Sequence, residues 1–375
     1  MRRIAALLAA VCLLCGGLWG CGDDGSGKGF RFPLEAEPKQ LDPQVSTDAS
    51  SVTVIAALFE GLTRLDAEGQ AVPGAADWTV SADGLTYTFT LRESYWSTMS
   101  RKGETTGFED PVMVTADDFV FGMQRWIDPQ TGSALAEELS GIQGAADILS
   151  GRKGVSTLAV RAVDDTTLTI TLTQPDAAFP ARLATTPFMP CNREFFKLTA
   201  GRYGLEKQYL ITNGPFLLQA WNHGDSLLLH KNAYYHDAKA VLPAAVRMVI
   251  GGDRTVEALR QGTMDAVALA PADVDDAAAA GAQVVALQDT LRSLWLNNRD
   301  ETLTNVSVRQ ALRDAVEWDT VYDYLRSVGE IPATGYIAPA AVTENGELYR
   351  QENERPAFRT DVAQAQTELG AGLAA

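Results

Sequence analysis

Residues 83–92 read Asp-Gly-Leu-Thr-Tyr-Thr-Phe-Thr-Leu-Arg, and this stretch carries the clearest structural signal in the chain. Between Thr86 and Leu91, polar and apolar side chains alternate, which is the period of a β-strand with one buried face. The turn residues 82–84 separate this segment from Trp78-Thr79-Val80. The pattern predicts a β-hairpin over residues 78–91.

A second hairpin is expected where Leu158 to Val163 and Leu168 to Leu172 flank the turn Asp164-Asp165. In both hairpins threonines occupy one face and large apolar residues the other. That arrangement is typical of a sheet with one solvated face.

A helix is expected between the two hairpins. Thr115 and Asp118 have the T-x-x-D spacing of a capping pair. Apolar residues from Phe119 to Trp126 then recur at helical spacing, which indicates a core stripe, and Pro129 ends the run.

The rest of the chain mixes short helical patterns with short apolar runs, so the fold class is α/β. Helices are expected at residues 255–260, 308–316, 320–325 and 362–369, with Gly262 and Gly370 ending the first and the last. Short buried strands are expected at residues 266–269, 284–287 and 294–296.

The N-terminus predicts export and lipid attachment. Arg2 and Arg3 precede an uncharged run from Ile4 to Trp19, which is shorter than the ~20 residues that span a bilayer. Residues 1–20 are therefore interpreted as a signal peptide. Residues 18–21 resemble a bacterial lipobox with Cys21 as the acylated residue, although Trp19 is unusual there, and ordinary secretory cleavage is the alternative. Residues 21–28 are expected to form a flexible tether.

Composition excludes several classes of protein. The chain has 375 residues, which predicts two or three domains. Its net charge of −17 argues against nucleic-acid partners. Four cysteines are too few for a disulfide framework, and three histidines leave little room for a zinc enzyme. Removal of the signal peptide and lipidation of Cys21 would leave Cys191 as a free thiol. We interpret it as a small buried residue that fills space in the core.

No catalytic constellation is found, so we expect neither an enzyme nor a cofactor. The sequence has no H-E-x-x-H, G-x-S-x-G or Walker motif. His223, His230 and His236 are spaced unlike ordinary metal ligands, and we expect them to face solvent or to hydrogen-bond locally. A secreted hydrolase stays an unsupported alternative.

Seven short motifs follow one another along the chain. They lie at residues 38–43 (P-x-x-L-D-P), 58–62 (L-F-E-G-L), 72–78, 83–92, 114–119 (V-T-A-x-D-F), 213–216 (N-G-P-F) and 306–312 (V-R-x-A-L). The series resembles the bacterial extracellular solute-binding family 5, the oligopeptide-binding proteins of ABC importers. The resemblance covers nearly all of the chain after the signal peptide.

The resemblance implies a two-lobed fold of the type II periplasmic-binding-protein class, with an extra α+β domain inserted in lobe I. Residues 29–60 and 205–288 would form lobe I, residues 61–204 the insert, and residues 289–375 the start of lobe II. The family continues beyond this point, so we expect a C-terminal truncation with an open apolar edge on lobe II. An incomplete gene product and a shortened protein with a changed role are both compatible with this interpretation.

The function that the resemblance implies is the capture of short peptides in a cleft between the lobes and their delivery to an ABC permease complex. A peptide can pair there as an added β-strand. The resemblance implies that the following residues face the ligand: Thr47, Asp48, Ala49, Ser50, Phe121, Asn213, Gly214, Trp295, Asn297 and Asn298. Phe121 could equally belong to the core, and Asn213 could cap a turn.

Alternatives within the same family stay open. The chain could sense peptides, bind a nickel chelate, heme or sugar, or be a non-functional fragment of a binder. In each case the lipid anchor would hold it at the outer face of a membrane or in a periplasm.

Overall fold

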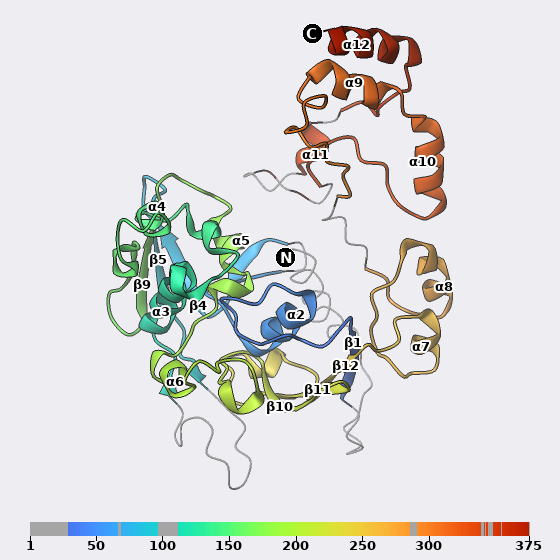
Figure 1. Cartoon of the computed structure of the whole chain (residues 1–375). Helices are drawn as coiled ribbons and strands as arrows, with labels where there is room; N and C mark the ends of the chain where they lie inside the picture. Colours follow the sequence, from blue (N-terminus) through green and yellow to red (C-terminus); the bar gives the residue numbers. More distant parts are fainter. Residues whose placement is uncertain are drawn as a thin grey trace. The chain divides into compact units, whose positions relative to one another are not determined.

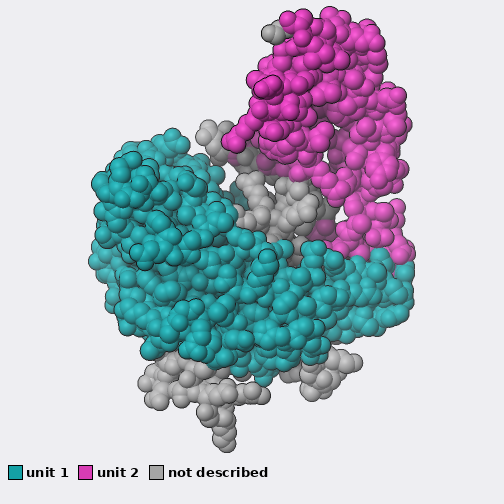
Figure 2. Space-filling model, in the orientation of Figure 1, with its two compact units in different colours: residues 1–267 teal, residues 268–375 magenta. Residues whose placement is uncertain are grey.

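The computed structural model describes residues 29–66, 69–96, 112–285, 291–338, 341, 343, 348–353 and 355–374. The expected signal peptide, the tether and Cys21 lie outside these residues. The chain divides into two compact units, residues 1–267 and 268–375 (Figure 2). Residues 268–288, which the resemblance places in lobe I, belong to the second unit, and the lobe boundaries stay a prediction.

The first sheet of the first unit joins the two ends of that unit. Its strand order is β1-β12-β11-β10, and β1 (Phe30–Leu34) pairs in parallel with β12 (Ala245–Ile250). β10 (Phe216–Asn222) and β11 (Ser226–Lys231) form an antiparallel hairpin with an irregularity between Leu218 and Ala220. Helix α2 (Ala49–Leu58) packs against β10 (Figure 1).

The second sheet confirms both predicted hairpins. β4 (Ala76–Val80) pairs with β5 (Thr86–Leu91), and β8 (Val160–Ala162) pairs with β9 (Thr167–Thr171). The hairpins join edge to edge through β5 and β9, which gives the order β4-β5-β9-β8. As predicted, the apolar side chains Tyr87, Phe89, Leu168 and Ile170 are buried, while the threonines of both strands lie on the more exposed face.

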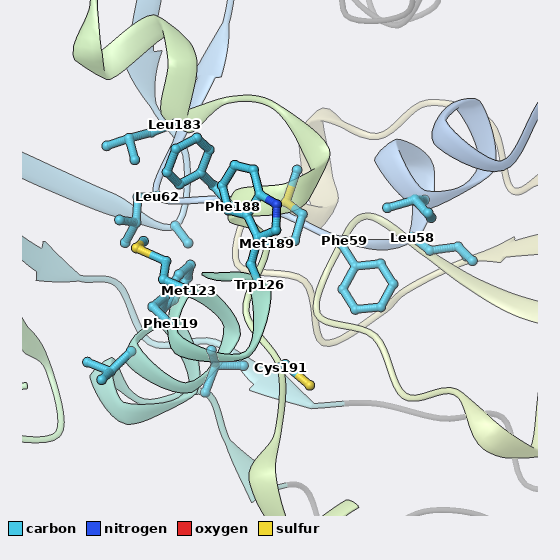
Figure 3. Packing of buried hydrophobic residues seen from close by; sticks show 14 of the residues in the cluster. Leu58, Phe59, Leu62, Phe119, Met123, Trp126, Leu183, Phe188, Met189 and Cys191 are labelled. Atoms are coloured by element: carbon cyan, nitrogen blue, oxygen red, sulfur yellow. The ribbon is translucent and has the colours of Figure 1, made fainter. Parts of the chain in front are cut away.

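Helix α3 (Ala116–Ile127) confirms the predicted helix and its capping pair. The backbone N–H of Thr115 donates to the Asp118 carboxylate over 2.9 Å, which completes a capping box. The apolar stripe of α3 enters the core of the first unit, where Trp126 packs edge-to-face on Phe188 with ring centroids 4.8 Å apart (Figure 3). The helix ends before Pro129, as expected.

Short elements complete the first unit. Two small sheets are formed by β2 (Thr63–Leu65) with β3 (Ala71–Pro73) and by β6 (Tyr95–Trp96) with β7 (Val112–Met113). The remaining helices are α4 (Ala145–Leu149), α5 (Phe179–Leu183), α6 (Arg193–Leu198) and α7 (Val256–Arg260), with 3-10 turns η2 (Pro129–Thr131), η3 (Ala136–Leu139), η4 (Val155–Thr157), η5 (Thr186–Phe188), η6 (Lys207–Tyr209) and η7 (Ala238–Ala240). α7 confirms the helix predicted at residues 255–260.

The regular secondary structure in the described residues of the second unit is helical. It contains η8 (Pro271–Asp273), α8 (Val274–Ala279), α9 (Val306–Asp314), α10 (Trp318–Ser327), α11 (Tyr349–Glu352) and α12 (Val362–Ala374). α9 and α10 confirm the two predicted helices. None of the helices in the described part of the chain combines the length and the apolar character needed to cross a bilayer.

The predicted end of the last helix at Gly370 is wrong, because α12 continues to Ala374. The reason is a helix–helix contact. A Cβ built on Gly372 would stand 2.7 Å from Cγ2 of Val308, so α12 lies closely against α9 at this glycine. The amide of Asn305 also donates to the carbonyl of Gly372 over 3.0 Å, which holds the last turn in place.

The predictions of strands at residues 266–269 and 294–296 are also wrong. The prediction of a strand at residues 284–287 is wrong for residues 284 and 285, which are the described ones. A strand needs a partner for its backbone hydrogen bonds. No described residues pair with these runs, and the side chains of Leu294 and Trp295 are 91% and 84% exposed. Residues 286 and 287 lie outside the described part.

Candidate functional site

The predicted ligand loop lies at the start of α2. Asp48 is the N-cap of the helix, and its Oδ1 accepts a hydrogen bond from the N–H of Ser51 over 2.9 Å. Ser50 is buried, and its Oγ accepts from the N–H of Ala36. Thr47 and Ala49 are exposed. Two of the four residues therefore shape the loop, and two present a free surface.

Asn213 and Gly214 lie at the other end of α2. The side chain of Asn213 accepts from the N–H of Glu60 over 3.1 Å and donates to the carbonyl of Glu60 over 2.9 Å. The N–H of Gly214 donates to the carbonyl of Leu58 over 2.9 Å. Because α2 has ten residues, these positions are separated from Thr47 by about 15 Å. The side chain of Asn213 therefore joins two chain segments through hydrogen bonds to the backbone.

Glu60, whose backbone contacts Asn213, belongs to a buried polar cluster that the sequence analysis missed. Its carboxylate is 6% exposed and accepts hydrogen bonds from the hydroxyl of Tyr235 and from Nε2 of His236, the latter over 2.6 Å. Burial, together with the charge of Glu60, raises the pKa of the Tyr235 hydroxyl. No local pattern indicated the cluster, because Glu60 lies 175 and 176 residues before its two partners in the chain.

Phe121 lies half-buried on α3, within a stack of aromatic rings and arginines. The ring packs edge-to-face against Phe196 of α6, and the guanidinium of Arg193 lies 4.3 Å from its centroid. Phe196 in turn lies 4.5 Å from the guanidinium of Arg125. The stack gives Phe121 a packing role between α3 and α6.

Arg125 of this stack also belongs to a buried ion pair. Arg125 of α3 donates a hydrogen bond to Asp42 from the P-x-x-L-D-P motif. Burial raises the pKa of Asp42, and the charge of Arg125 opposes that rise. Cys191, beside the pair, is fully buried, and burial raises the pKa of its thiol to about 12. A neutral thiol of this kind is a filler, which confirms the prediction.

The predicted ligand residues of the second unit lie in a segment without regular structure. Trp295 projects an exposed ring. Oδ1 of Asn297 accepts from the N–H of Arg299 over 3.1 Å, and the carbonyl of Asn298 accepts from the hydroxyl of Thr304 over 2.7 Å. The asparagines therefore shape a turn, while the ring of Trp295 is free.

We expected the histidines to face solvent or to hydrogen-bond locally, and two of them instead contact carboxylates that are distant in sequence, although His223 is also exposed. His236 contacts Glu60, and His223 contacts Glu37 and Glu206. Within the described ranges, no group of three or more His, Cys, Asp and Glu side chains is arranged to hold a metal ion.

Comparison with known proteins assigns the family. The sequence profile of the bacterial extracellular solute-binding proteins, family 5, matches residues 71–372. The chain belongs to this family. The dipeptide-binding protein DppE of Bacillus subtilis is 30% identical over 322 residues, which cover 84% of this chain and 57% of that protein. The oligopeptide-binding protein OppA of the same organism is 27% identical over 388 residues, which cover 99% of this chain and 68% of the relative.

Solved structures confirm the fold class. One solved structure shows the pheromone receptor PrgZ and its mode of peptide binding. Its sequence is 26% identical to this chain, and the two structures superpose with a TM-score of 0.73 over 92% of this chain and 68% of that chain. OppA of Burkholderia pseudomallei is 25% identical with a TM-score of 0.72, over 93% and 67%. The fold is therefore the α/β, type II periplasmic-binding class. The family 5 chain spans 57% of DppE and 49% of the dipeptide-binding protein of Lactococcus lactis.

Proposed function

We propose that this family 5 chain binds short peptides and delivers them to an ABC permease. One observation carries the proposal: the family profile matches residues 71–372, and relatives aligned over most of the chain are named as dipeptide- and oligopeptide-binding proteins. Their names describe those proteins, and the transfer to this chain rests on the shared family and fold.

The local geometry refines which predicted residues would touch a peptide. Thr47 and Ala49 at the start of α2, and the ring of Trp295, have exposed surfaces. Asp48, Ser50 and Asn213 use their side chains in internal hydrogen bonds. We therefore assign the first three to ligand contact and the second three to positioning.

A thermal melt of the chain lacking its signal peptide tests the proposal. A mixture of di- to pentapeptides should raise the melting temperature, because a ligand at about a hundred times its dissociation constant adds ~2.7 kcal/mol to the free energy of unfolding. A mixture of the same free amino acids is the control. If the chain melts cooperatively and neither mixture changes its melting temperature, peptide binding is contradicted.

Trp295→Ala separates ligand contact from folding. Because the ring is 84% exposed, its removal should leave the unliganded melting temperature unchanged and reduce the shift caused by peptides. Tyr336→Ala, which removes another aromatic ring of the same unit with 83% exposure, is the matched control. An undiminished shift in the Trp295 variant would remove this residue from the proposed site.

A steroid acid is a second candidate ligand. The probable deoxycholate-binding periplasmic protein YgiS of Escherichia coli is 34% identical over 214 residues, which cover 56% of this chain and 38% of that protein. Deoxycholate below its micellar concentration, in the same melt, tests this alternative. Stabilisation by deoxycholate together with no response to peptides would favour it.

We further propose that the chain is a lipoprotein, acylated at Cys21 and held at the outer side of a membrane. The apolar run followed by Gly20-Cys21 supports this proposal. Partition of the full-length protein into a detergent phase, and its loss in Cys21→Ala but not in Cys191→Ala, would test it. Equal partition of both variants would contradict acylation at Cys21.

A further inference from the structure

Three segments of the first unit meet around the imidazole of His223, in the turn between β10 and β11. Nδ1 of His223 lies 3.0 Å from Oε1 of Glu37, in the segment between β1 and α2. Nε2 lies 3.2 Å from Oε2 of Glu206, directly before η6. One side chain therefore connects the turn to two segments that are distant from each other in sequence.

Both ring nitrogens face oxygens that can only accept hydrogen bonds. A neutral imidazole carries one N–H, whereas the imidazolium carries two. Both contacts are therefore hydrogen bonds only when His223 is charged. We propose that His223 is a pH-operated tie, which fastens the segment around Glu206 to the β10–β11 turn when protonated and releases it when neutral.

The two contacts differ in what else supports them. The Glu37 carboxylate also accepts from Nε1 of Trp221 over 2.6 Å and from the N–H of Gly224 over 2.8 Å. In the described part of the chain, the Glu206 carboxylate contacts His223 alone. The contact with Glu37 is the shorter of the two, so in the proposed tie the neutral ring keeps its proton on Nδ1 and turns a lone pair toward Glu206, which is released.

The charged groups nearby do not replace this contact. Asp225, in the same turn, is paired with Arg247 of β12 at 3.9 Å. Arg202, on the segment that carries Glu206, donates to the hydroxyl of Tyr209. The hydrogen bonds with Glu37 and then with Glu206 raise the pKa of His223 above its ordinary value of 6.5, which agrees with the geometry. The tie is thus complete below pH 6.5 and is lost as the pH rises through the raised pKa.

The segment that the tie holds is the one that re-enters the first sheet. The carbonyl of Gly204 accepts from the N–H of Leu41 over 2.7 Å, and its N–H donates to the carbonyl of Tyr209 over 3.0 Å. The chain then continues to Asn213 and β10. Release of Glu206 should loosen residues 204–210 without unfolding the sheet. This inference is independent of the identity of the ligand.

Amide hydrogen exchange of the full chain between pH 6 and pH 9 tests the tie, with the intrinsic pH dependence of exchange divided out. Protection at Gly204 and Tyr209 should fall roughly two- to fivefold across this range, as expected for an exposed ion pair. Glu206→Gln should abolish the fall, because the glutamine amide can accept from the imidazolium and donate to the neutral ring. His223→Ala, which has no side-chain donor, should show the lower protection at every pH.

His230→Ala, which removes a histidine from the neighbouring strand β11, is the matched control and should behave like the wild type. The titration of the His223 ring, followed by NMR and assigned with the His223→Ala variant, gives a second measurement. The proposal is overturned by constant protection in the wild type, by an equal fall in Glu206→Gln, or by a His223 pKa at or below 6.5.

Discussion

Arg125 of α3 donates a hydrogen bond to Asp42, which precedes it by 83 residues, and the two side chains are only 6% and 10% exposed. The pair links the helix between the two hairpins to the segment that follows β1. Because both charges are buried, each depends on the other for its stability, and the loss of one partner leaves an uncompensated charge in the core.

We expect Arg125→Met and Asp42→Asn each to lower the free energy of unfolding by about 3–5 kcal/mol, since each leaves one group of the pair buried without its counterpart. The double variant should lose less than the sum of the two. Urea denaturation of the four proteins measures the coupling. Additive losses would show that the two side chains act independently.

Asp118 should make stability fall as the pH rises from about 4 to 6. Burial raises its pKa from 3.8 to about 6, against the hydrogen bonds from Thr115 and Trp96. The folded state therefore binds a proton that the unfolded state has already released, and unfolding becomes easier as the pH increases through this window. The contribution is up to about 3 kcal/mol, from ~1.4 kcal/mol per pKa unit.

Asp118→Asn should flatten this part of the stability curve, because asparagine does not titrate. The neighbouring variant Asp117→Asn, at an exposed position of the same helix turn, is the control for a change of charge at the N-terminus of α3. If the curves of the wild type and Asp118→Asn run parallel between pH 4 and 6, the pKa of Asp118 is ordinary in the folded state.

Gly214→Ala should destabilise the first unit by roughly 1–3 kcal/mol or more, as overpacking does. A Cβ at this position would stand 2.6 Å from the carbonyl carbon of Leu58, so the chain around Gly214 must move away from the end of α2. Gly154→Ala is the matched control, because a Cβ there meets nothing within 4 Å. Thermal melts of both variants check the prediction, and equal melting temperatures would refute the close contact.

Glu60→Ala should cost about 1–3 kcal/mol, because it leaves the Tyr235 hydroxyl and the His236 ring without their acceptor. Glu60→Gln should cost less, since its amide oxygen can accept from one of the two donors. The exposed Glu35, changed to Ala, is the control. Urea denaturation gives the ranking, and a neutral Glu60→Ala would mean that water replaces the carboxylate.

The sequence predicted local structure well and long-range pairing poorly. The hairpins around residues 82–84 and 164–165 and helix α3 are specified by alternation, turn residues and caps within a few positions. The runs at residues 266–269 and 294–296 have strand-like composition but no pairing partner, so the same pattern gave wrong predictions. Local composition cannot show whether a second strand is present.

The candidate site shows the same division. Asn213 was selected from a motif, yet its amide binds the backbone of Glu60, a residue 153 positions earlier. The partners of Glu60 and His223 come from distant segments, and only the folded chain brings them together. The family and the fold class, in contrast, followed from motifs in the correct order, and the comparisons confirmed both.

The parallel pairing of β1 with β12 sets an order for folding. Residues 30–34 are among the first of the described chain to be synthesised, but their partner strand ends at Ile250. The closed loop between them contains both hairpins and α3, whose contacts are mostly nearer in sequence. Loop closure over such a distance is slow, so the sheet β4-β5-β9-β8 should form first and β1 should dock last. A nascent chain that ends before residue 245 would therefore carry an unpaired first strand.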